Sequence, residues 1–300
     1  MAKKKSSSVI KKISRLDSVP NDFQNRVAKS QIELNKLISK QTSLLELTST
    51  GEVAQTEGNY AIANKIKSQL QESVLSTSYS DSLKDFSKQF NVQKALNETL
   101  YAEISNGKFV AKSIYDSAWG SSKMNAMTAL TEIPTTFTSG LANILDGGIT
   151  GKTPYSKVLQ SVSDLILGDD KVEGAFYKYT KQISKDLFAI SDRTYMQVVS
   201  EDMGYEYFLY FGGIVDDSRC FCVERHDKYY SKYEIEQWGL GKLIGECNTG
   251  GGKWAGRNTN TNESTIWTYV GGYNCDHLFL PADIEDVPQD VIDRQSKYKK

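Results

Sequence analysis

The sequence YFLYFGGIV at residues 207–215 marks the point where this chain of 300 residues changes character. Aromatic residues favour β-strands, and the two glycines that follow them indicate a turn. The residues before this stretch repeat apolar side chains at helical spacing, whereas those after it alternate short apolar runs with turns. The sequence therefore predicts a mainly α N-terminal region followed by a small α+β C-terminal domain.

The N-terminal region carries its apolar side chains three and four residues apart, which is typical of amphipathic helices packed on neighbours. Four segments show this pattern: residues 21–50, 82–104, 153–168 and 172–190. We expect a helical domain over residues 21–200. Within it, GGITGKT at 147–153 resembles a phosphate-binding loop, but Asp146 stands where that motif requires glycine. We interpret these residues as a Gly-rich connector.

The C-terminal domain, residues 201–300, is expected to begin with the strand at 207–211. Its further predicted elements are a short helix at 232–238, a polar loop at 247–265, a strand-like segment at 265–270 and an apolar strand at 277–280.

Charge is unevenly distributed along the chain. The net charge is −1, but residues 1–50 hold ten Lys or Arg against four Asp or Glu. We expect residues 1–20 to be a flexible basic arm that contacts phosphate or an acidic protein surface, with a solvated tail as the alternative. The basic residues of this arm are Lys3, Lys4, Lys5, Lys11, Lys12 and Arg15. No apolar run is long enough for a membrane span or a signal peptide, so we expect synthesis inside the cell and no membrane partner.

All four cysteines and both histidines lie between residues 220 and 277. The pairs Cys222-x3-His226 and Cys275-x-His277 supply two thiolates and two imidazoles, which is a donor set for one structural zinc ion. Two other interpretations stay open. The cysteines could be packed thiols beside hydrogen-bonded histidines, or a disulfide such as Cys222 to Cys275 could form. Cys220 and Cys247 are weaker ligand candidates.

The C-terminal sequence resembles the phage Mu F-like minor head proteins, also called phage head morphogenesis proteins. The resemblance rests on YFGGIVDDSR at 210–219, on the residues Cys222, Glu224, Arg225, His226, Tyr230 and Glu234, and on GGYNCDH at 271–277. That family has a Thr-Arg dipeptide before a cysteine and a later Cys-x-His or Cys-x-Cys element. Arg219, Cys222, Cys275 and His277 match this pattern, while Ser218 replaces the threonine. Asp217 and Arg219 are taken as part of the structural motif.

The resemblance implies a minor structural protein of a tailed bacteriophage that acts in head assembly and is associated with the portal or the head interior. Its partners would be the portal, other head proteins and packaged double-stranded DNA. The protein would be located in the host cytoplasm during assembly and then in the virion head. No enzymatic activity is implied and no catalytic residue is assigned.

The alternative is a metal-dependent nuclease or toxin-like effector carried on a phage. Such an enzyme needs a general base beside an open metal site, for which Glu224, Asp216 or Asp217 are the candidates. An ion pair between Arg219 and these two aspartates is the simpler interpretation of their proximity.

Overall fold

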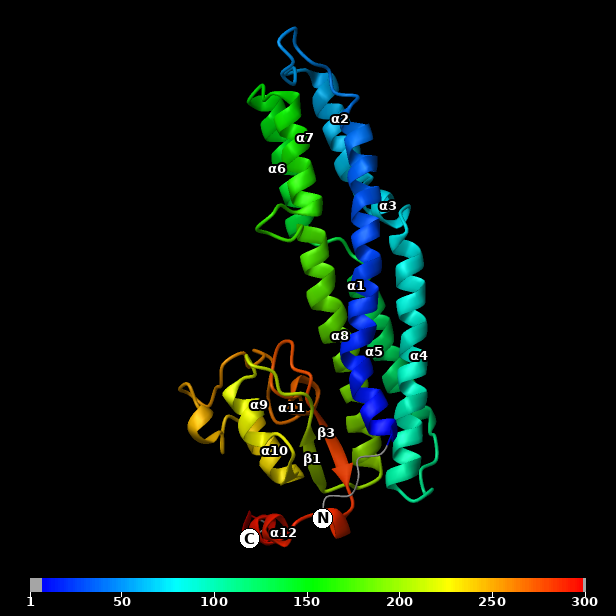
Figure 1. Ribbon diagram of the computed structural model, residues 1–300, viewed down its shortest axis with the longest axis vertical. Helices are drawn as coiled ribbons and strands as arrows, with labels where there is room; N and C mark the ends of the chain where they lie inside the picture. Colours follow the sequence, from blue (N-terminus) through cyan, green and yellow to red (C-terminus); the bar gives the residue numbers. More distant parts are fainter. Residues whose placement is uncertain (1–6, 299–300) are drawn as a thin grey trace. The chain divides into compact units, whose positions relative to one another are not determined.

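Helices dominate the chain, and one small sheet lies near its C-terminal end, as the sequence predicts (Figure 1). The structure is a computed structural model that describes residues 7–298. The helices that precede the sheet are α1 (Ser7–Thr42), α2 (Glu57–Ser68), α3 (Leu70–Leu75), α4 (Tyr79–Ile104), α5 (Ser113–Thr131), α6 (Thr135–Thr150), α7 (Tyr155–Leu167) and α8 (Ala175–Asp202). The C-terminal elements are β1 (Tyr207–Phe211), α9 (Cys220–Arg225), β2 (Lys228–Ser231), α10 (Lys232–Gly239), η1 (Gly245–Cys247), α11 (Ile266–Tyr269), β3 (Leu278–Ala282), η2 (Ile284–Asp286) and α12 (Gln289–Tyr298).

The described chain forms two compact units, each built from separate stretches of sequence. The helical unit contains residues 19–88 and 127–184. The sheet-containing unit contains residues 7–18, 89–126 and 185–298. The divisions fall inside α1, α4, α5 and α8, so each of these helices contributes residues to both units.

The helical unit has an aromatic core. Phe23 stacks on Phe86 with ring centroids 4.6 Å apart, and Tyr79 meets Phe176 edge to face at 5.0 Å. Phe23, Phe86 and Phe176 come from three of the predicted apolar stripes, whereas Tyr79 lies before the second one. Such aromatic pairs add to the free energy of burial. The buried Tyr79 hydroxyl donates to the Leu130 carbonyl at 2.6 Å, so its polar end is satisfied.

The glycine-rich stretch at 147–148 is helical and not a loop. Both glycines lie inside α6, and a Cβ at Gly148 would approach Val158 of α7 to 2.8 Å. Glycine is needed here because α6 and α7 lie side by side (Figure 1) and Val158 leaves no room for a side chain at this position. Packing therefore outweighs the low helix propensity of glycine.

The sheet-containing unit holds an antiparallel sheet in the order β2-β1-β3. Alternation along β1 sends Phe208 and Tyr210 into one apolar cluster and Tyr207 into another, beside Val287 and Val291. The strand predicted at 207–211 and the helix predicted at 232–238 are confirmed. The strand-like segment predicted at 265–270 is wrong, because residues 266–269 form α11.

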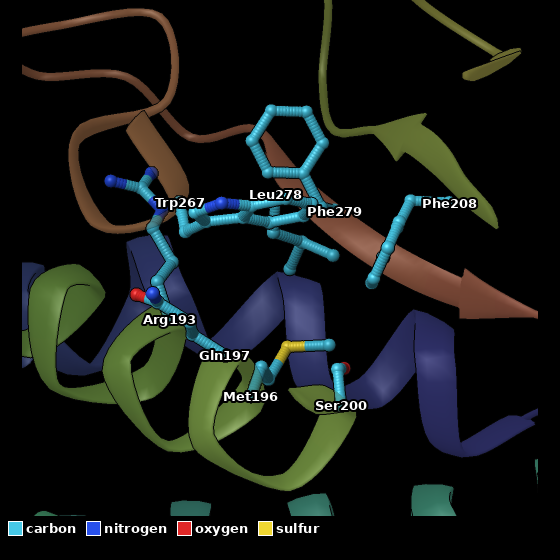
Figure 2. Close-up of a pocket in the computed structure, with 8 residues that line it drawn as sticks. All are labelled: Arg193, Met196, Gln197, Ser200, Phe208, Trp267, Leu278 and Phe279. Atoms are coloured by element: carbon cyan, nitrogen blue, oxygen red, sulfur yellow. The ribbon is translucent and has the colours of Figure 1, made fainter. Parts of the chain in front are cut away.

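The C-terminal half of α8 packs against β1, β3 and α11. Figure 2 shows Met196 and Ser200 of α8 beneath Leu278 and Phe208. The space enclosed between these elements is about 10 Å³, which holds one water molecule at most. This contact is a packed core and not a ligand pocket.

The structure differs from the expected flexible arm, since residues 7–20 are the first part of α1. Lys12 is fully buried and forms an ion pair with the equally buried Asp192 of α8. Gln93 and Asn97 of α4 donate to the other carboxylate oxygen at 3.0 and 2.9 Å. Burial lowers the pKa of Lys12, while the charge of Asp192 opposes this shift. The pair ties the start of α1 to α4 and α8, and residues 1–6 of the predicted arm lie outside the described residues.

Within residues 7–298, no helix is both long enough and apolar enough to span a bilayer.

We expect Lys12→Met to lower the free energy of unfolding by about 3–5 kcal/mol, because it leaves Asp192 buried without a cation. The neighbouring Lys11 is exposed, so Lys11→Met should change stability by less than about 0.5 kcal/mol. Urea denaturation of both variants measures the difference. Adding Asp192→Leu to Lys12→Met should restore much of the loss, and equal stability of the two single variants would contradict a structural ion pair.

Candidate metal centre

Three of the four predicted zinc ligands meet at one buried point. Cys222 lies on α9, whereas Cys275 and His277 lie in the segment that leads into β3. The two sulfurs are 3.9 Å apart, and Cys275 Sγ is 3.8 Å from His277 Nδ1. The three side chains offer ligand atoms within 4.8 Å of one another, and the residues are only 3–5% exposed. This group could hold a metal ion.

Two glycines allow the backbone to approach the group closely. A Cβ at Gly271 would lie 2.6 Å from Cys222 Sγ and 2.8 Å from Cys275 Sγ. A Cβ at Gly212 would lie 2.7 Å from the Cα and Cγ atoms of His277. Any other residue at either position would displace the ligands, so the glycines after β1 and before Cys275 are part of the site.

Aromatic side chains enclose the group. The Tyr210 hydroxyl donates to Cys222 Sγ at 3.3 Å, and its ring stacks on His277 with centroids 4.8 Å apart. Trp254 stacks on Phe221 at 4.0 Å and donates its indole N–H to the Gly271 carbonyl at 2.9 Å. The tryptophan thereby fixes the backbone segment that bears Cys275.

The electrostatic environment favours a thiolate at Cys275. The hydrogen bond from Cys222 lowers the pKa of Cys275 well below its ordinary value, and His277 and Arg193 act in the same direction against burial. The hydrogen bond to Cys275, together with burial, raises the pKa of Cys222. Arg193 of α8 also donates to the Cys275 carbonyl. Because metals bind thiolates, one sulfur is already prepared for an ion.

The distances agree with a tetrahedral ion. Two sulfurs each about 2.3 Å from zinc are about 3.8 Å apart, and a sulfur and a nitrogen ligand are about 3.6 Å apart. The separations of 3.9 and 3.8 Å are close to both values. The residues present therefore fit a metal of the zinc type.

His226, the fourth predicted ligand, lies beside this group and not within it. Its ring is perpendicular to that of His277 with centroids 5.7 Å apart. Its Nε2 is 3.5 Å from the carboxylate of Asp227. Its backbone N–H donates to the Cys222 carbonyl at 2.9 Å, which places it at the end of α9.

The remaining cysteines are joined in a disulfide between Cys220 and Cys247, while Cys222 and Cys275 remain free thiols. The pairing named in the sequence analysis, Cys222 to Cys275, is therefore wrong for this structure. Cys247 lies in η1, within an irregular connection whose sequence has no periodic pattern. Nothing in the sequence indicated that this connection returns to the start of α9.

Asp217 and Arg219 are not paired with each other. Within residues 7–298, Arg219 forms no ion pair with Asp216 or Asp217, and both aspartates are exposed. Arg219 instead donates to the Tyr273 carbonyl at 2.5 Å, two residues before Cys275. The Ser218 hydroxyl accepts from the Val215 N–H at 2.8 Å and closes the turn before α9. The motif residues thus shape the two segments that carry the thiols.

The predicted basic contacts are only partly available. Lys3, Lys4 and Lys5 lie outside the described residues. Lys12 is buried against Asp192, so its predicted contact with DNA or a portal is wrong. Arg15 is half-buried and donates to Gln89 and Gln93, whereas Lys11 is exposed.

Sequence reasoning missed Tyr210, Arg193 and Gly271 as parts of the site. Tyr210 and Gly271 lie in the stretches that carry the family resemblance, so their presence there was a usable signal. Arg193 lies within a helical segment and has no local signal, because its contact with residue 275 exists only in the folded chain.

We expect Gly271→Ala to lower the free energy of unfolding by about 1–3 kcal/mol, because the added methyl group overlaps both sulfurs. Gly213 is the matched control, since a Cβ there meets no atom within 4 Å. Urea denaturation followed by tryptophan fluorescence reports on the unit that contains Trp254. A Gly271→Ala protein as stable as Gly213→Ala would contradict the close packing described above.

Comparison with models of known protein families, with curated proteins and with solved structures found no match.

Proposed function

We propose that the chain is a minor head protein of a tailed bacteriophage, and that one structural zinc ion stabilises its C-terminal module. The observation that carries the proposal is the convergence of residues that are far apart in sequence. The Cys222 thiol reaches Cys275 across 53 positions, and Arg219 reaches the Tyr273 carbonyl across 54. These are residues through which the sequence resembles the phage Mu F-like minor head proteins.

A structural role suits the burial of the ligands. A catalytic zinc ion keeps an open coordination position for water or substrate, whereas a structural ion is enclosed by protein. Cys222, Cys275 and His277 are at most 5% exposed, and Tyr210 and Gly271 pack directly against them. Binding an ion here would join α9 to the segment before β3, and the binding free energy would contribute to folding. The fourth proposed donor is His226, whose ring centroid is 5.7 Å from that of His277.

The alternative of a metal-dependent nuclease has less support. Glu224, its candidate general base, is paired with Arg225 at 3.2 Å and lies near Cys220 and Cys247. Asp216 and Asp217 are exposed in the turn before α9. None of these carboxylates belongs to the group formed by Cys222, Cys275 and His277.

The proposed partners are the portal protein, other head proteins and packaged double-stranded DNA. Among the six basic residues suggested for the last contact, Lys11 is the described one with an exposed side chain. The proposed location is the host cytoplasm during assembly and then the virion head. Release of particles into an oxidising medium is compatible with the disulfide between Cys220 and Cys247.

We expect protein purified without a histidine tag to contain zinc bound by Cys222, Cys275 and His277. Inductively coupled plasma mass spectrometry measures the zinc content. Cys222→Ser and Cys275→Ser should each abolish this binding, because each removes a thiolate ligand. The matched control is the double variant Cys220→Ser/Cys247→Ser, which should retain one zinc ion per chain. Absence of zinc from the control would refute the structural ion.

The head assignment is tested on particles produced by the strain that encodes the chain. Mass spectrometry of purified heads, separated from tails, should detect the chain at low copy number relative to the major capsid protein. Detection only in the particle-free lysate would contradict the assignment. DNA cleavage by the purified protein that disappears in Glu224→Ala would favour the nuclease instead.

A further inference from the structure

A second group of potential ligands lies at the disulfide. Cys220 and Cys247 are covalently joined, and the Glu224 carboxylate is the third member of this group. The ligand atoms of all three lie within 4.8 Å of one another. Glu224 follows Cys220 by four positions on α9, so both side chains project from the same side of the helix.

The Glu224 carboxylate lies next to η1. Its Oε1 is 3.8 Å from Cys220 Sγ, and its Oε2 accepts from Arg225 at 3.2 Å. A Cβ at Gly245 would lie 3.5 Å from the same Oε2 atom. A disulfide sulfur has no proton to donate, so Oε1 gains no hydrogen bond from Cys220 in the oxidised protein. This oxygen is placed to share a cation with the sulfurs.

The disulfide is open to reductants. Cys220 is exposed and the Glu224 side chain is 36% exposed, in contrast to the buried Cys222 and Cys275. Thiol–disulfide exchange requires an attacking thiolate to reach a disulfide sulfur, and exposure of Cys220 permits this. The cytosol of a host cell supplies such thiols and keeps exposed cysteines reduced.

We propose that reduction of the Cys220–Cys247 disulfide creates a second metal site, in which Cys220, Cys247 and Glu224 bind a divalent zinc-type cation. Two molecules of a cellular thiol are oxidised to their own disulfide, the protein S–S bond breaks, and two electrons and two protons pass to Cys220 and Cys247. Binding of the cation then releases these two protons to water. Two sulfurs and one carboxylate suit zinc, and a solvent molecule can complete the partly exposed site.

The site keeps the connection between α10 and α11 attached to α9 in both redox states. The disulfide closes a segment of 27 positions, and reduction alone would return conformational freedom to it. A bound cation restores the cross-link. The module would thus be closed by a metal in the cytosol and by a covalent bond in an oxidising medium.

The test compares zinc binding by two forms of the full chain. One form has two free thiols per chain and the other, after reduction, has four, as established by thiol titration in denaturant. Each is incubated with zinc, desalted and analysed for metal. We expect one more zinc ion per chain in the four-thiol form, and loss of this extra ion in both Cys220→Ser and Cys247→Ser.

A carboxylate variant controls for a misfolded protein. We expect Glu224→Gln to weaken the extra site at least tenfold in a competition titration with a zinc chelator, while Glu246→Gln, the exposed acidic neighbour of Cys247, leaves it unchanged. Equal zinc content in the two-thiol and four-thiol forms would overturn the proposal, as would retention of the extra ion in both serine variants. The difference in zinc content between the two forms is independent of the group formed by Cys222, Cys275 and His277. If that group binds no zinc, the two-thiol form will contain no metal.

Discussion

The contact between Arg193 and the segment before β3 is the interaction on which the candidate site depends. Arg193 lies on α8 and donates to the carbonyls of Cys275 and Thr268. One side chain therefore anchors both the residue that supplies a thiol and the short helix α11. The Asn274 N–H also donates to Asp186 of α8, at 2.9 Å. Since these bonds leave from a long rigid helix, the position of Cys275 is set before any ion is bound, which lowers the entropy lost on binding.

Close approach of backbone to side chain is the second constraint. Gly212 directly follows β1 and Gly271 lies just after α11, yet both lie against the ligands at distances that exclude a methyl group. Tyr210 and Trp254 then fill the remaining space with aromatic rings and satisfy one sulfur and one carbonyl. The result is a site whose polar atoms are partnered mainly by the protein, and the buried Nε2 of His277 and Nε of Arg193 are exceptions.

The amino-acid pattern predicted what depends on local periodicity and missed what depends on distant packing. The β1 strand follows from five aromatic or apolar residues in a row. The helix predicted at 232–238 is α10, and the structure adds a capping box formed by Ser231 and Glu234. Residues 265–270 have strand propensity, but a single helical turn buries Ile266 and Trp267. Burial of these two side chains therefore outweighs the preference of the residues for a strand. The pairing of Cys220 with Cys247 depends on the course of an irregular connection, and the fate of Lys12 depends on a carboxylate 180 positions away. Neither of these long-range contacts can be predicted from a local sequence pattern.

The discontinuity of the sheet-containing unit has a consequence for the order of events during synthesis. Its first stretch, residues 7–18, leaves the ribosome long before residues 185–298 exist. Until α8 is made, Lys12 lacks Asp192, and the apolar face around it has no partner from that helix. Contacts of such large sequence separation form slowly because the intervening chain must first be brought together. The nascent N-terminal helix therefore lacks its partner from α8 until about two thirds of the 300 residues have been made.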